Sequence, residues 1–177
     1  MEHTQLEVTE CLTGGDGEMM CFALDRVRKE LAWKTGGLNA AQLRHRLPSS
    51  AMTLAGLIKN LALVEDQFTA MTQGLTSGPL QSQQPQDGRD EWITALDDTP
   101  NALYAMWYDA VQRSRSAWVQ MITNNGLDEV IDDPDPAWNK NRRRILVDLL
   151  EENLIHLGHV DLLRESIDGR RGHGWPD

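Results

Sequence analysis

Residues 145–169 read ILVDLLEENLIHLGHVDLLRESIDG, and this stretch decides both the expected fold and the expected site. Its leucines and isoleucines recur about every three or four positions, the spacing of one face of an α-helix. Three polar side chains, Glu152, His156 and His159, fall at the same spacing, in line with Ile145 and Leu163. Burying such groups without partners would cost several kcal/mol. The helix is therefore expected to place them in a site that satisfies them.

The same periodicity predicts further long helices along the chain. The long helices are expected over residues 17–35, 51–71, 99–123 and 140–167, and the last range contains most of the quoted stretch. Ser49 or Ser50 would cap the second of these helices, and Thr99, followed by a proline, would cap the third. A capping-box pattern, Asn39 with Gln42, predicts one short extra helix between the first two.

Four amphipathic segments without any convincing alternating strand pattern predict an all-α protein, a four-helix bundle of antiparallel or mixed helices. Residues 72–91 are rich in Gly, Ser, Gln and Pro, so helices two and three are expected to be joined by a long crossover, either a plain connection or a functional lid. The expected domain organisation is a flexible leader at 1–16, a single domain at 17–170 and a tail at 171–177.

Composition excludes several classes of function. The net charge is −10, from 17 Lys and Arg against 27 Asp and Glu, so the chain repels nucleic acid, which is not expected as a partner. No apolar run approaches the ~20 residues that span a bilayer, so no membrane association is expected. Cys11 and Cys21 form no disulfide framework, and the acidic N-terminus lacks a signal peptide. A cytoplasmic location is the expectation.

The chemistry of the fourth helix has two interpretations. Glu152 and His156 lie one turn apart and could bind a single divalent metal, with a third ligand from another helix; zinc or nickel suits such donors best, and iron or manganese is possible. Alternatively, Glu152 accepts a hydrogen bond from His156 or His159, and the cluster is satisfied without metal. Spacing alone does not choose between them.

Three segments carry a resemblance to a known family. They are HLGHVDLLRESIDG at 156–169, GLIKNLALVE at 56–65 and ALDRVRKELAWKTGGLNAAQLRHRL at 23–47. Together with their surroundings, residues 18–170, they resemble the DinB-like superfamily of four-helix bundles. The resemblance is closest to the actinobacterial branch of unknown function that is related to mycothiol-dependent maleylpyruvate isomerases.

The resemblance implies a divalent metal held by a His on helix two and by two residues four apart on helix four. The helix-four pair falls on Glu152 and His156, and His159 falls on a polar neighbour of the site. The helix-two position falls on Asn60, where the family has His. An amide oxygen is a weaker donor to zinc-like ions than imidazole, so metal affinity should be lower, or the metal lost. Asp148 is a second departure, which either restores ligand charge or faces solvent.

Two functions remain open. The first is a metal-dependent thiol transferase or isomerase, with mycothiol as the thiol cofactor, a small-molecule thiol or electrophile as substrate, and Trp92, Trp107 or Trp138 as pocket walls. The second is a non-catalytic bundle that has lost its metal and acts as a dimer or a protein-interaction module. A homodimer is expected in either case, and whether the protein is an enzyme is left open.

Overall fold

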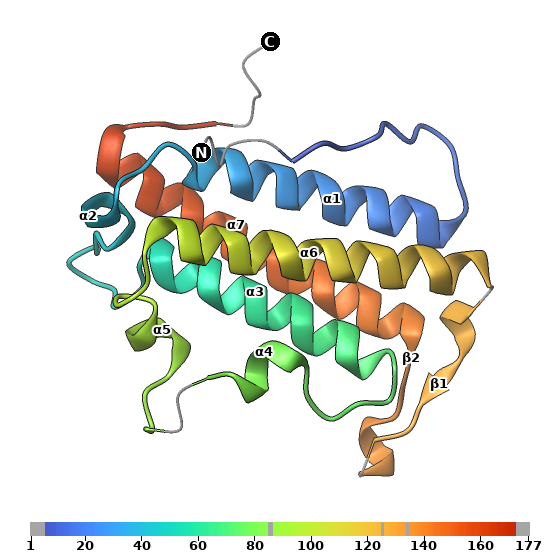
Figure 1. Ribbon diagram of the computed structural model, residues 1–177. Helices are drawn as coiled ribbons and strands as arrows, with labels where there is room; N and C mark the ends of the chain where they lie inside the picture. The colour runs from blue at the N-terminus through green and yellow to red at the C-terminus, as the bar shows by residue number, and fades with distance from the viewer. Residues whose placement is uncertain (1–5, 85–86, 125, 134, 173–177) are drawn as a thin grey trace.

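The computed structural model describes residues 6–84, 87–124, 126–133 and 135–172. Within these residues, four long helices form a bundle, which Figure 1 shows. They are α1 (Asp16–Thr35), α3 (Leu54–Met71), α6 (Pro100–Thr123) and α7 (Arg142–Asp168). The prediction of an all-α four-helix bundle is therefore confirmed, with boundaries that differ from the expected ones by at most three residues at the start of α3.

The order of the helices explains the long crossover. In Figure 1, α1 and α7 run in one direction, and α3 and α6 run in the opposite one. α3 packs on both α6 and α7, and α1 packs mainly on α7. Because α3 and α6 are parallel neighbours, the chain has to return along the length of the bundle between them, which a short turn cannot do.

Side chains at the helix starts fix those starts. Thr53 Oγ1 accepts a hydrogen bond from the Gly56 amide at 3.0 Å, so α3 begins after Thr53 and not after Ser49 or Ser50. Thr99 caps α6 as predicted. The predicted capping box around Asn39 is confirmed and starts the one-turn helix α2 (Ala40–Leu43).

The two longest connections between the main helices contain short regular elements. The crossover holds α4 (Pro79–Ser82) and α5 (Glu91–Thr94). The segment between α6 and α7 holds two short 3₁₀ helices, Gly126–Asp128 and Pro136–Trp138, and an antiparallel pair of two-residue strands, β1 (Val130–Ile131) and β2 (Lys140–Asn141). This pair of strands does not alter the all-α class, and two residues per strand are too few to produce an alternation that the sequence could show.

The core between the four helices is built from aliphatic side chains and two buried indoles, Trp107 and Trp118. Part of the expected leader lies on this core: Leu6 packs against it, and Arg115 donates to the Glu7 carbonyl oxygen at 3.0 Å. No helix in the described ranges is long and apolar enough to cross a membrane. His173 and the end of the predicted tail lie outside the described residues.

Candidate functional site

The buried face of α7 is not the one that spacing predicted. Its members are Ile145, Leu146, Asp148, Leu149, Asn153, Leu157, Val160, Leu163 and Arg164. Glu152, His156 and His159 lie beside this stripe, partly exposed, so the prediction that they continue it is wrong. Asn153 faces the core instead of its neighbour Glu152, because consecutive side chains of an α-helix point about 100° apart around the helix axis. It is fully buried, and its Nδ2 donates to the Leu149 carbonyl at 3.0 Å.

The three predicted residues of α7 nevertheless stay together. His156 Nε2 lies 3.7 Å from Glu152 Oε2, which is too long for a hydrogen bond. The rings of His156 and His159 are 5.6 Å apart between centroids and tilted by 48°. Burial lowers the pKa of His156; the carboxylate of Glu152 opposes this effect and His159 adds to it. His156 is therefore a neutral imidazole at pH 7, with a nitrogen lone pair available.

Asn60 on α3 meets a residue that sequence reasoning missed. Its Nδ2 donates to Oε1 of Glu91 at 3.0 Å, and Glu91 is the first residue of α5. The side chain of Asp90 caps α5 by accepting from the Ile93 amide at 3.0 Å. The sequence did carry a signal, an Asp followed by a glutamate, which is typical of a helix start. Nothing local indicated that this helix would pack on Asn60.

Helix α5 packs on α3, and its Trp92 reaches a side chain of α7. The Trp92 ring lies 6.2 Å from the His156 ring, centroid to centroid. On the other side Trp92 packs so closely on α3 that a Cβ added to Gly56 would lie 2.7 Å from its Cε3 atom. Of the three tryptophans expected as walls, Trp92 thus adjoins the cluster, whereas Trp107 is in the core and Trp138 lines a separate pocket.

Three buried atoms of the predicted site residues have no hydrogen-bond partner in the described part of the chain. They are Asn60 Oδ1, His156 Nδ1 and His159 Nδ1. Buried polar atoms are normally satisfied, and an exception calls for an ion, a water or a ligand. An amide oxygen and two imidazole nitrogens are donors that a divalent metal accepts, so the residues fit such an ion in kind.

The donor set is nevertheless incomplete by the usual standard. Among the described residues, no group of three or more His, Cys, Asp or Glu side chains is arranged to hold a metal. Asp148 adds nothing to the set, because its carboxylate pairs with Lys140 at 2.8 Å and with Arg144. It therefore neither restores ligand charge nor stands free in solvent. A metal at this cluster would depend on the oxygen of Asn60.

Comparison with known proteins agrees with the fold. A family model described as mycothiol-S-transferase matches residues 20–169. No curated protein matches the chain. Among solved structures, the crystal structure of a conserved protein from Enterococcus faecalis superposes with a TM-score of 0.64 at 18% sequence identity, covering 92% of this chain and 100% of that one. At that identity, the likeness concerns the fold alone.

Proposed function

Because the chain belongs to the mycothiol-S-transferase family, a DinB-like family, we propose that it transfers the thiol mycothiol to a small electrophile at a divalent metal held between α3 and α7. The ligands in this proposal are Asn60 through Oδ1, His156, His159 and Glu152. The observation that carries it is the set of three partnerless buried atoms on these two facing helices.

The chemistry that such an ion supplies is a lowered pKa of a coordinated thiol, which yields a thiolate at neutral pH. The residues of the chain do the rest. Burial keeps His156 neutral and thus able to act as a donor. Glu152, whose side chain is 43% exposed, would bring a negative charge to the ion at the solvent edge of the site, where the thiol proton could leave to water. Trp92 shields the His156 side of the site.

Glu91 completes the proposed site without acting as a ligand. A carboxylate only accepts hydrogen bonds, so it binds the Nδ2 side of the Asn60 amide and leaves Oδ1 as the free end. Groups that orient a metal ligand in this way often change metal affinity by ~10–100-fold when removed.

Two observations favour the second candidate, a bundle without metal that acts through protein contacts. The bond between Asn60 and Glu91 already satisfies half of the amide, and no conventional three-residue ligand group exists among the residues described. In that case the cluster is a polar patch under α5, and its free atoms bind water.

Elemental analysis of protein purified without chelator separates the two. We expect about one equivalent of a transition metal in the wild type, little in His156→Ala, and an unchanged content in His45→Ala, which alters an exposed histidine on another segment. The loaded protein should consume mycothiol in the presence of a chromogenic electrophile.

An empty wild type would contradict the proposal, provided that EDTA leaves its thermal stability unchanged. If Asn60→His fills under the same conditions, the scaffold has kept the geometry of the site and lost its ion, and the second candidate stands.

A further inference from the structure

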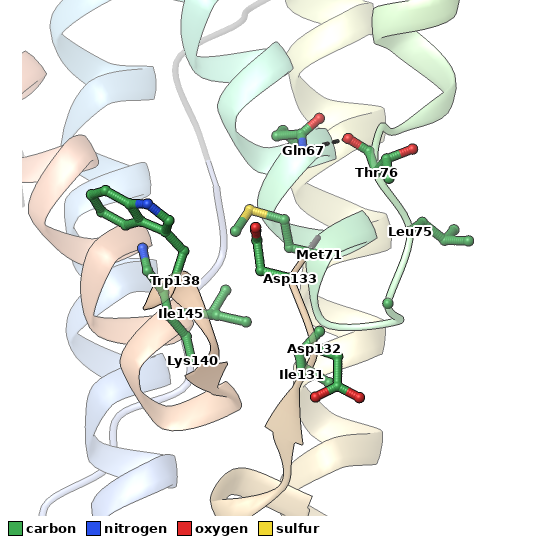
Figure 2. A pocket seen from close by; sticks show the side chains of 11 residues that line it. Gln67, Met71, Leu75, Thr76, Ile131, Asp132, Asp133, Trp138, Lys140 and Ile145 are labelled. Atoms are coloured by element: carbon green, nitrogen blue, oxygen red, sulfur yellow. Dashed lines mark hydrogen bonds between the residues drawn. The ribbon is translucent and has the colours of Figure 1, made fainter. Parts of the chain in front are cut away.

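A pocket lies near the C-terminal end of α3, apart from Asn60 (Figure 2). Its volume is about 320 Å³, within the range of about 300–1,000 Å³ that is typical of small-molecule sites. Gln67 and Met71 form its α3 wall, and Gln67 lies about 10 Å further along the helix axis than Asn60. Ile145 at the start of α7 contributes an apolar wall. The pocket is thus independent of the proposed metal.

Opposite α3, Ile131, Asp132, Asp133 and Trp138 line the pocket, and hydrogen bonds between described residues hold Asp133. The Asp133 amide donates to Asn139 Oδ1 at 2.8 Å, and the Asp135 amide donates to Asp133 Oδ1 at 2.9 Å. At the start of α7, Arg142 Nε donates to the Thr72 carbonyl at 2.9 Å, which ties this helix to the end of α3. These bonds position Asp133 and join the start of α7 to the end of α3 beside the pocket.

The charges around the pocket favour a cation. Among the described residues that line it, Lys140 is the one basic side chain, and its Nζ pairs with Asp148 at 2.8 Å. Asp132 and Asp133 also line the pocket, and within the described ranges neither pairs with a lysine or arginine. The chain as a whole carries a charge of −10, which adds a long-range attraction for positive ligands.

The apolar surfaces favour an organic cation over a metal ion. The Trp138 side chain is 64% exposed and lines the pocket together with Met71 and Ile145. In Figure 2 the carboxylate of Asp133 points toward the Met71 side chain, with the Trp138 indole across the pocket, whereas that of Asp132 points away from the indole. An aromatic ring attracts ammonium groups, and a carboxylate that lines the same pocket adds an attraction between opposite charges.

We propose that this pocket binds a small organic ammonium ion with an apolar body. The positive nitrogen lies against the Trp138 indole and the Asp133 carboxylate, and the apolar part contacts Met71 and Ile145. Neither the fold nor the proposed transferase chemistry requires such a site, so it would be an additional binding function.

The test uses choline and its neutral isostere 3,3-dimethylbutan-1-ol, which have the same shape and differ in charge. With the whole protein, ¹H–¹⁵N NMR should show choline shifting Met71, Asp133 and the Trp138 indole. Choline should bind about fivefold more tightly than the isostere, since the cation contacts both an aromatic face and a carboxylate. Asp133→Asn and Trp138→Ala should each abolish this preference.

Asp132→Asn is the matched control, because it removes an equal charge from the neighbouring residue and should leave the preference intact. Circular dichroism and an unchanged spectrum around Asn60 establish that the variants are folded. The proposal is overturned if choline and its isostere bind equally, if choline shifts no pocket residue, or if Asp132→Asn weakens binding as much as Asp133→Asn.

Discussion

Glu91 decides which end of the Asn60 amide is held and which end stays without a partner. The 3.0 Å hydrogen bond from Nδ2 to the Glu91 carboxylate fixes the amide, because a carboxylate cannot donate. A side chain on a one-turn helix of the crossover thus sets the chemical character of a residue on a main helix. The family resemblance implied Asn60 as a member of the site, and nothing in the sequence indicated Glu91 as its partner.

Replacing Glu91 by Gln should weaken metal binding by about tenfold, because a glutamine can donate as well as accept and no longer orients the amide. Metal affinity would be measured by competition with a chelator, with Glu151→Gln, an exposed change on α7, as the control. If Glu91 acts through Asn60, the same change should have no further effect in an Asn60→Ala background. Equal losses in both backgrounds would assign Glu91 another role.

His156 should make the fold less stable in acid. Burial lowers its pKa below the ordinary value of 6.5, so the unfolded chain binds a proton more readily than the folded one. Above pH 6.5, His156 does not make the free energy of unfolding depend on pH. As the pH falls below 6.5 toward the lower pKa of His156 in the folded protein, the free energy of unfolding decreases. Urea unfolding between pH 8 and 5 should show a steeper loss for the wild type than for His156→Gln. A midpoint above 6.5 in an NMR titration of His156 would refute the assignment.

At the scale of elements, α5 reaches the site because α3 has a glycine beneath it. Gly56 leaves room for the Trp92 ring, and Trp92 in turn contacts His156. The crossover is therefore a wall of the site as well as a connection. Its position could not be read from residues 72–91, whose composition indicates a loop, because docking depends on a vacancy on a different helix.

Gly56→Ala should destabilise the protein by about 1–3 kcal/mol, because the new methyl group overlaps the Trp92 ring. Gly158→Ala on α7 is a matched control: a Cβ there meets nothing within 4 Å, so the better helix propensity of alanine should stabilise by about 0.5–1 kcal/mol. Chemical denaturation measures both, and Trp fluorescence reports the displacement of α5. Stabilisation by both changes would mean that α5 is not docked through Gly56.

Across the whole molecule, a buried ionic network joins three of the four long helices. Arg28 on α1 donates through Nε to Glu65 on α3 at 2.7 Å and through Nη2 to Ser114 on α6 at 2.8 Å. The Nη1 atom of Arg28 pairs with Asp25 at 2.8 Å. Both Arg28 and Glu65 are almost completely buried, so each charge depends on the other.

Glu65→Ala should therefore cost about 3–5 kcal/mol of unfolding free energy, since it leaves the Arg28 guanidinium buried without its main counterion. The comparison is Glu165→Ala, which removes one partner of the exposed pair with Arg171 and should leave stability nearly unchanged. Both would be measured by urea denaturation at neutral pH. A loss below about 1 kcal/mol for Glu65→Ala would show that water or a rearranged Asp25 replaces the carboxylate.

The sequence by itself determined where the long helices lie, because caps such as Thr99 and the ~3.6-residue periodicity act within a few positions along the chain. It also brought Glu152, His156 and His159 together, since one helix carries all three. Only the tertiary structure decided that Asn153 and not Glu152 faces the core, that Glu91 meets Asn60 across 31 positions, and that Trp138 faces a separate pocket. These contacts depend on how helices pack on one another, and local spacing carries no record of that packing.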